Sequence, residues 1–354
     1  MLNFERILTA PDNNIRSALK QMDEVGEKIL LVVGPESVLL GTVTDGDIRR
    51  WILKELSLDE NIACVMNKKP IVLKNEIYSK DIAKKIMTDN LIEYLPVVDK
   101  DSHIVNVMRW TELFGNKLRR FEKINIPVVI MAGGKGTRLS PYTKILPKCL
   151  IPIGDKTILE LIIDRFAEHG CNDFYLSLNY KATMIKSYFN DIEYSYNLSF
   201  LEEKDFLGTA GSLYMLKGLI NGTFFLSNCD ILVDADYAEV LDFHINQKNI
   251  ITVIASVKHI TIPYGICKIE NGGRIEKIEE KPQYECLVNT GFYIIESDVI
   301  NDFMDNSFLN MTEVIEKCIS QQCRVGIYPI SEKSWIDTGQ MEGLHETFLS
   351  FGIK

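Results

Sequence analysis

The chain has 354 residues, of which 46% are hydrophobic and 25% charged, a composition that is typical of a globular protein with room for two domains. Its formal net charge of −10, without any basic run, argues against a nucleic-acid partner. The start MLNFERILTA lacks the apolar core of a signal peptide, and no apolar run reaches the ~18 residues of a membrane helix. The eight cysteines are scattered without a CxxC pair. We therefore expect a cytoplasmic protein with reduced thiols and no membrane contact.

Residues 1–120 contain an internal repeat with a constant offset between its two copies. Val32-Val33 returns as Val97-Val98, and Leu39-Leu40 returns at the same offset as Ile104-Val105. Each copy predicts a short helix, an apolar strand, a turn, a second strand and a closing helix. Because one such unit cannot bury both faces of its sheet, we expect the two copies to pair.

The first copy ends in GTVTDGDIRR, residues 41–50, which resembles the signature of a CBS domain, and residues 5–118 resemble a tandem CBS pair. The resemblance implies an adenine nucleotide between the copies, with Thr44 and Asp45 near its ribose. At the same offset the second copy has Arg109 and Trp110, so one of the two sites lacks the pattern. Two interpretations stay open: a nucleotide-sensing module, or a packing or dimerisation module without a ligand, in which Asp45-Gly46-Asp47 caps the next helix. Since CBS pairs commonly associate, we expect a homo-oligomer.

After residue 120 the pattern changes to alternating strands and helices, which is typical of a parallel sheet with crossover helices. The predicted strands are 127–131, 173–178, 223–228 and 250–257. The predicted helices are 157–169, 181–189, 209–220, 235–247, 312–321 and 339–350, with hairpins or strands at 264–281 and 288–295. The fold prediction is therefore an α/β module over residues 1–120, followed by a doubly wound, Rossmann-like α/β domain over residues 121–354 with a substrate-binding insertion.

The strand 127–131 runs directly into a glycine-rich loop. Three glycines in four positions let the backbone bend sharply and turn its N–H groups toward an anion. The loop is followed by Pro141 and Pro147, which keep the chain irregular as far as about residue 157, and Lys148 lies ten residues beyond Arg138. Neither the P-loop spacing nor the dinucleotide-binding spacing is present. We expect the loop to bind a triphosphate through residues Ala132, Gly133, Gly134, Lys135, Gly136, Thr137 and Arg138.

The segment GGKGTRL with the later Pro147-Lys148 resembles the signature of the sugar-phosphate nucleotidyltransferases, or NDP-sugar pyrophosphorylases, and the resemblance extends over residues 126–354. It implies that Gly133 and Gly134 pack against the nucleotide and that Arg138 and Lys135 hold the β- and γ-phosphates. It also implies that Lys148 approaches the phosphates at the reacting centre.

Five further segments match the family pattern. Asp230 follows an apolar strand and Asp337 lies in Trp335-Ile336-Asp337-Thr338-Gly339, and the resemblance makes these two aspartates the ligands of Mg²⁺. Glu280-Lys281-Pro282 and Asn289-Thr290-Gly291 match elements that hold the sugar and its phosphate in the family. Gly208-Thr209-Ala210-Gly211 matches a turn beside the base and sugar.

Together these elements indicate one reaction, in which a sugar phosphate oxygen attacks the α-phosphorus of a nucleoside triphosphate and pyrophosphate leaves. The acidic stretch before Gly208 resembles that of sugar-1-phosphate guanylyltransferases, and the carboxylate of Glu203 suits the two N–H donor groups on the edge of guanine. The alternative is that these acidic residues are solvent-facing charges.

A CBS pair fused to a guanylyltransferase-like domain resembles the enzymes that make GDP-glucosamine for bacterial legionaminic-acid synthesis. The favoured reaction is therefore GTP with α-D-glucosamine 1-phosphate, and the alternatives are mannose 1-phosphate as the sugar or UTP, dTTP or CTP as the nucleotide. Two other classes of protein remain as alternatives. One is a non-catalytic sensor of adenine nucleotides. The other is a glycosyltransferase with a DxD metal motif at Asp234-Ala235-Asp236, although this segment is more simply interpreted as the start of a helix.

Overall fold

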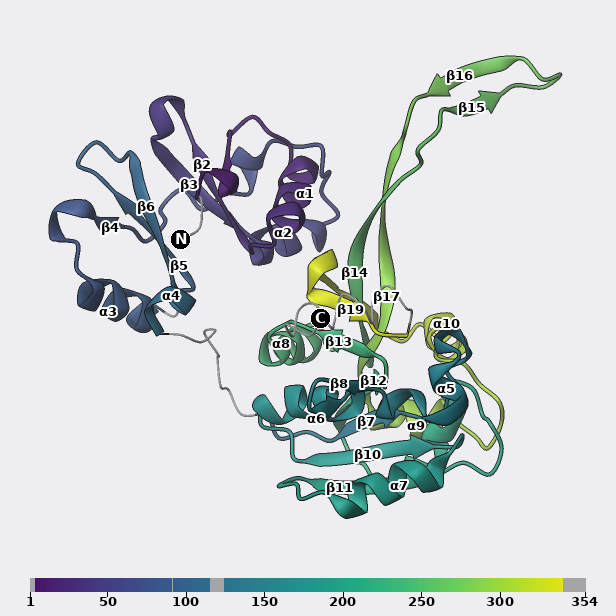
Figure 1. Cartoon of the computed structure of the whole chain (residues 1–354). Helices are drawn as coiled ribbons and strands as arrows, with labels where there is room; N and C mark the ends of the chain where they lie inside the picture. Colours follow the sequence, from purple (N-terminus) through teal and green to yellow (C-terminus); the bar gives the residue numbers. More distant parts are fainter. Residues whose placement is uncertain (1–3, 91, 115–123, 340–354) are drawn as a thin grey trace. The chain divides into compact units, whose positions relative to one another are not determined.

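The computed structural model of the protein describes residues 4–90, 92–114 and 124–339, whose helices and strands can be followed in Figure 1. Its contacts divide the chain into two compact units. The first unit holds Met1–Arg120, Lys258–Cys286 and Ser331–Lys333, and the second holds Phe121–Val257, Leu287–Ile330 and Ser334–Lys354.

In the first unit the two repeat copies have the same order of elements. The first copy has β1 (Leu8–Thr9), α1 (Ile15–Val25), β2 (Ile29–Val33), β3 (Leu39–Thr44) and α2 (Asp45–Ile52). The second copy has β4 (Leu73–Lys74), α3 (Lys80–Asn90), β5 (Tyr94–Val98), β6 (Ile104–Arg109) and α4 (Trp110–Phe114). Ile29 pairs with Thr44 in one copy and Tyr94 with Arg109 in the other, each with a bulge at the equivalent place. This shared register confirms the repeat and its constant offset.

The two copies also share a core. Val98, Ile104 and Val107 of the second copy pack in the same buried cluster as Ile15 and Leu30 of the first. A backbone bridge joins Val38 to His103, which occupy the same position in the two copies. The pairing expected from the exposed faces of a single copy is therefore present.

The second unit is built on a seven-stranded sheet in the order β11-β10-β7-β12-β17-β14-β18. Its strands are β7 (Val128–Met131), β10 (Asp173–Leu178), β11 (Asn197–Glu202), β12 (Thr223–Asn228), β14 (Ile251–Thr261), β17 (Gln283–Glu296) and β18 (Val325–Ile330). β7 is parallel to both of its neighbours, whereas β17 is antiparallel to β12. The sheet is thus mixed, and β7 and β12 bring their carboxyl ends to the same edge.

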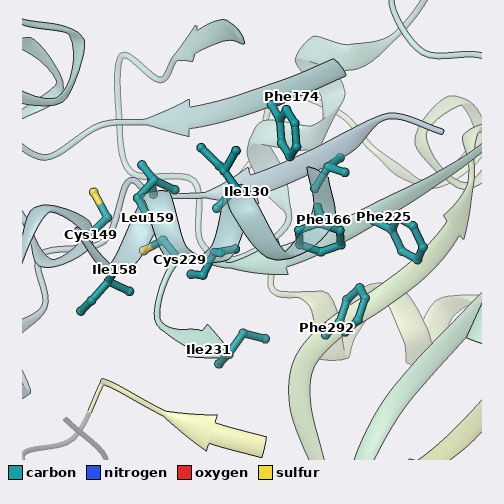
Figure 2. Close-up of a cluster of buried hydrophobic side chains, with 14 of the residues drawn as sticks. Ile130, Cys149, Ile158, Leu159, Phe166, Phe174, Phe225, Cys229, Ile231 and Phe292 are labelled. Atoms are coloured by element: carbon teal, nitrogen blue, oxygen red, sulfur yellow. The ribbon is translucent and has the colours of Figure 1, made fainter. Parts of the chain in front are cut away.

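Helices cover both faces of this sheet, because alternate strand residues enter two different cores. Val128 and Ile130 of β7 pack in one core, and Val129 packs in the other. The first core is covered by α6 (Ile158–Glu168), α7 (Ala182–Asp191) and α8 (Tyr237–Gln247), and the second by η7 (Gly211–Leu216), α9 (Ser297–Phe303) and α10 (Met311–Ser320). Figure 2 shows Phe166 at the centre of the first core, with ring centroids 5.4 Å from those of both Phe225 and Phe292. The three layers agree with the doubly wound expectation.

Shorter elements complete the chain. The hairpin of β15 (Ile266–Ile269) and β16 (Ile275–Glu279) connects β14 to β17. The other short elements are α5 (Tyr142–Ile145), β8 (Pro152–Ile153), β9 (Lys156–Thr157), β13 (Ile231–Val233) and β19 (Trp335–Asp337). None of the helices in the described ranges is long and apolar enough to cross a membrane.

Some local predictions differ from the structure, which also contains β11 and α9 where no strand or helix was predicted, and one prediction cannot be compared. The segment 209–220 forms only the 3₁₀ helix η7, because Gly211 packs against Ser307 O, where a Cβ would lie at 2.3 Å, and Gly218 has a φ of +76°. The strand β18 was not predicted because it contains Gly326 and Pro329, a combination that is tolerated at the sheet edge where β18 lies. The predicted helix at 339–350 falls outside the described residues except for its first position.

Candidate active site

The glycine-rich loop leaves β7 at the carboxyl edge of the sheet and packs tightly against its surroundings. A Cβ on Gly133 would lie 3.2 Å from Glu203 Oε1, so the backbone there passes directly over this carboxylate. Gly136 has a φ of +63°, and a Cβ on it would lie 2.9 Å from the Cβ of Lys148. The loop thus needs glycine at position 136 for its backbone conformation and for contact with the stem of Lys148.

Hydrogen bonds from Lys181, a residue farther along the chain, support the irregular stretch between the loop and Lys148. The Lys181 ammonium donates to the carbonyl oxygens of Lys144 and Ile145 at 2.8 and 2.6 Å, and so satisfies groups at the end of the short helix α5. Sequence reasoning missed this positioning residue, because Lys181 lies far beyond Lys148 in the chain and belongs to no motif.

A two-stranded ribbon brings Asp230 and Asp337 together, although they lie far apart in the chain. β13 pairs with β19 so that Ile231 lies opposite Asp337, which puts Asp230 beside the end of β19. Thr338 is fully buried, and its backbone N–H and its hydroxyl both donate to the carbonyl oxygen of Asp230 at 2.8 Å. The two carboxylates are therefore fixed by backbone pairing and not only by their side chains.

The cation next to these carboxylates is Lys148. Its ammonium forms an ion pair with Asp230 Oδ2, and the side chains are only 9% and 12% exposed. A Cβ on Gly339 would collide with Asp230 Oδ2 and lie 2.8 Å from Asp337 Oδ1, so both carboxylates approach the α-carbon of this residue closely, where only glycine fits. Two neighbouring carboxylates supply the kind of oxygen ligands that a divalent ion such as Mg²⁺ binds.

A cleft of about 310 Å³ opens over this pair. Arg138, Asp230 and Asp337 line it together with Asn289 and Thr290. Its other lining residues are Thr209, Asn228, Ile231, Gly291, Tyr293, Met311, Thr312 and Trp335. The cleft thus brings together five of the site residues predicted from the sequence. Lys148 is not among the lining residues, but it forms an ion pair with Asp230, which is.

The side chains of Asn289 and Thr290 are engaged with the protein itself. The Asn289 amide donates to Tyr293 Oη at 2.8 Å and accepts from the backbone N–H of Gly291 at 3.0 Å. The Thr290 hydroxyl donates to the carbonyl of Ile254 at 2.7 Å and is almost fully buried. These contacts hold β17 in shape where it lines the cleft.

Tyr293 and the start of α10 are cleft residues that the sequence motifs do not identify. Met311 N donates to Thr209 Oγ1 at 3.0 Å, which ties the first turn of α10 to the turn at residues 208–211. The Asn310 and Glu313 capping box was the available signal, since it marks the start of this helix in the sequence.

Glu203 is buried beneath the glycine-rich loop, with 5% exposure. Its Oε1 accepts from the Ser177 hydroxyl at 2.6 Å, and its Oε2 accepts from the backbone N–H of Leu207 at 3.3 Å. The preceding residue, Glu202, is exposed and pairs with Lys186. The acidic stretch is therefore not uniformly solvent-facing.

The remaining candidate residues are described by their local structure. Lys135 and Thr137 are exposed, whereas Gly208 is buried with a φ of +82°. Glu280 and Lys281 belong to the first unit, at the end of the β15–β16 hairpin, where both are exposed.

Thr44 and Asp45 have partners within their own helix. Thr44 forms a capping box with Asp47 at the start of α2, and Asp45 pairs with Arg49 at 2.6 Å. These contacts agree with the capping interpretation and do not test whether a nucleotide binds.

Two cysteines are sequence neighbours of the charged residues Lys148 and Asp230, and both are unreactive thiols. Cys149 follows Lys148 and Cys229 precedes Asp230, and both point into the first core (Figure 2). Burial raises the pKa of Cys229 to about 12 and also raises that of Cys149. Both are therefore thiols near neutral pH, and neither is a suitable nucleophile.

Comparisons with known proteins agree with this arrangement. Residues 127–351 match the nucleotidyl transferase family. The chain is 31% identical over 225 residues to a mannose-1-phosphate guanyltransferase of Yarrowia lipolytica, covering 60% of this chain and 60% of that protein. It is 30% identical over 192 residues to a UTP–glucose-1-phosphate uridylyltransferase of Synechocystis sp., covering 49% of this chain and 50% of that protein.

The chain therefore spans about half to three fifths of the length of these relatives. Among solved structures, HddC from Yersinia pseudotuberculosis is 24% identical, with a TM-score of 0.50 over 64% of this chain and 99% of that one. This likeness shows a shared fold.

Proposed function

The chain belongs to the nucleotidyl transferase family, and from this we propose that it transfers a nucleotidyl group from a nucleoside triphosphate, preferably GTP, to a sugar 1-phosphate. In this reaction a phosphate oxygen of the sugar 1-phosphate forms a bond to the α-phosphorus. The bond from the α-phosphorus to the bridging oxygen of the β-phosphate breaks, and pyrophosphate leaves with the electron pair.

The observation that carries the proposal is the meeting of two carboxylates, one buried lysine and a glycine-rich loop at the carboxyl ends of β7 and β12. In α/β sheets this edge is where nucleotides bind. No general base is needed, because a phosphate monoester is anionic near neutral pH. Catalysis is then mainly positioning and charge neutralisation, which such an arrangement supplies.

In the proposed assignment, backbone N–H groups of Ala132–Thr137 and the side chain of Arg138 hold the leaving phosphates. Lys148 approaches the reacting phosphate, and Lys281 with Glu280 binds the sugar phosphate and sugar. Asp230 and Asp337 would hold Mg²⁺, which when bound offsets phosphate charge and polarises the phosphate oxygens.

The preference for GTP rests on Glu203. Its buried carboxylate, fixed by Ser177 beneath the loop at Gly133, offers an acceptor to the N1–H and N2–H₂ groups of guanine. Uracil and thymine present a single N–H between two carbonyl groups and gain less from a carboxylate. The mannose-1-phosphate guanyltransferase relative supports this preference, and the uridylyltransferase relative keeps UTP as the alternative.

For the sugar we propose α-D-glucosamine 1-phosphate, so that the product is GDP-glucosamine, a precursor in legionaminic-acid synthesis. This choice is supported by the repeat module of residues 5–118, which we interpret as a CBS pair that binds an adenine nucleotide at Thr44 and Asp45. Mannose 1-phosphate is the second candidate sugar. A cytoplasmic homo-oligomer is part of the same proposal.

The experiment is a matrix of four nucleoside triphosphates against glucosamine, mannose and glucose 1-phosphates, followed by pyrophosphate release with Mg²⁺. We expect the highest kcat/KM for GTP with glucosamine 1-phosphate. Equal kcat/KM for dTTP and GTP would refute the role of Glu203, and a preference for mannose 1-phosphate would refute the sugar assignment. Absence of turnover with every pair would favour the sensor alternative.

A further inference from the structure

Lys148 spans two parts of the active site with one side chain. Its stem passes beneath the glycine-rich loop, since a Cβ on Gly136 would lie 2.9 Å from Lys148 Cβ and 3.3 Å from Lys148 Cδ. Its ammonium reaches Asp230, the second residue after β12. The stem is thus held at the proposed phosphate site, and the charged end lies at the proposed metal site.

The ammonium lies among the two carboxylates. A single point, the Cβ position on Gly339, is 2.4 Å from Asp230 Oδ2, 2.5 Å from Lys148 Nζ and 2.8 Å from Asp337 Oδ1. All three charged atoms therefore converge on the same side of the Gly339 α-carbon. Because the side chains of Asp230 and Lys148 are largely buried, each charge depends on the other for compensation.

From this geometry we infer that Lys148 is the resident counter-ion of the Asp230–Asp337 pair, and that its ammonium and a divalent cation exclude each other at Asp230. The inference rests on the proposed metal site and adds the order in which the ammonium and the metal occupy Asp230. With a divalent ion held by Asp230, the Lys148 ammonium would lose this partner, and the short movement that the fixed stem allows would turn it toward the phosphates.

Charge repulsion explains why the Lys148 ammonium and a divalent cation would not both remain at Asp230. Two carboxylates and one ammonium leave one net negative charge, so the cluster is nearly neutral without metal. A divalent ion within ~4 Å of the ammonium would meet strong repulsion at low effective dielectric, whereas the phosphates of a bound nucleotide offer the displaced ammonium a new partner. Lys148 would thus turn toward the phosphates once a divalent ion is held by Asp230.

The test measures metal binding without nucleotide. Mn²⁺ is titrated into the full chain, and free Mn²⁺ is followed by electron paramagnetic resonance in the wild type, Lys148→Met and Lys144→Met. Lys144 is an exposed lysine four residues before Lys148 and controls for the loss of one positive charge. We expect Lys148→Met to bind Mn²⁺ at least tenfold more tightly than the wild type, and Lys144→Met to stay within twofold. Equal or weaker binding by a folded Lys148→Met variant would overturn the inference.

A second measurement covers the case in which Lys148→Met does not fold. In wild-type protein labelled with ¹³C at lysine Cε, the Lys148 resonance is assigned by its loss in Lys148→Arg. We expect it to shift as Mg²⁺ saturates the site without nucleotide, and an unchanged resonance at saturation contradicts the exclusion. Neither readout depends on turnover, so failure of the proposed reaction and failure of this inference give different results.

Discussion

The replacement Glu203→Gln tests the proposed base recognition, because it removes a charge while keeping the size of the side chain. Glu203 is 5% exposed, and Ser177 at 2.6 Å fixes its carboxylate. The Ser177 hydroxyl can donate to the glutamine oxygen, but the amide NH₂ then faces the Leu207 N–H, which donates to the second carboxylate oxygen at 3.3 Å, so the melting temperature of the variant is compared with that of the wild type first. What is lost is the negative charge that, in the proposed base recognition, faces the two donor groups of guanine.

The expected size follows from hydrogen bonds to charged groups, which contribute about 1.5–3 kcal/mol each. Losing one such bond, because an amide NH₂ replaces an accepting oxygen, corresponds to a fall of about 10- to 150-fold in kcat/KM for GTP. Since a pyrimidine has one N–H on this edge and does not require a carboxylate, kcat/KM for UTP should change by less than about threefold. The ratio of the two values should therefore fall by at least about tenfold.

The assay is pyrophosphate release with saturating sugar 1-phosphate and varied GTP or UTP. Glu202→Gln is the matched control, since Glu202 is the neighbouring residue but is exposed and pairs with Lys186. It should leave both values nearly unchanged. If Glu203→Gln lowers kcat/KM equally for GTP and UTP, then Glu203 only supports the loop, and the reasoning about guanine is refuted.

Three further predictions concern the metal site, the turn at residue 208 and the first unit. Asp230→Asn should lower Mg²⁺-dependent pyrophosphate release at least ~10²-fold with unchanged circular dichroism, and a variant at full rate contradicts the metal assignment. Gly208→Ala would place a Cβ 2.6 Å from the Leu309 carbonyl at a φ of +82°, so calorimetry should show a melting temperature lower by about 4 °C or more; an unchanged value contradicts the close packing. Contacts with Asp23, the larger cause, and with a second carboxylate raise the pKa of His259 to about 9. The protonated form is therefore favoured by folding, so its stabilisation is complete below about pH 6.5 and is lost as the pH rises through about 9. His259→Gln should remove this loss from thermal melts between pH 7 and 10, and identical pH profiles of wild type and variant contradict it.

The sequence predicted those elements whose signal is local. The central strands of the second unit have apolar centres, and their predicted bounds lie within one residue of β7, β10 and β12. The repeat was visible because equivalent residues recur at a constant offset. In contrast, η7 is shortened by contact with the distant Ser307, and β18 forms because an edge strand tolerates proline. Both outcomes depend on tertiary context, which no local pattern contains.

The same distinction holds for the candidate site. Motifs identified Asp230 and Asp337, but only the β13–β19 ribbon shows that they meet. The ion pair of Lys148 with Asp230 joins residues 82 positions apart and could not be read from spacing. Conversely, Asn289 has its amide engaged by Tyr293 and Gly291, a contact that its motif does not predict.

The transfer of a nucleotidyl group to the sugar phosphate can be measured directly. A single ³¹P NMR time course of the full chain with GTP, glucosamine 1-phosphate and Mg²⁺ measures all phosphorus species together. We expect one pyrophosphate and one sugar-linked diphosphate to appear for each sugar phosphate consumed, and GTP to stay intact when the sugar phosphate is left out. No conversion of either substrate, or release of pyrophosphate without the sugar phosphate, would contradict this expectation.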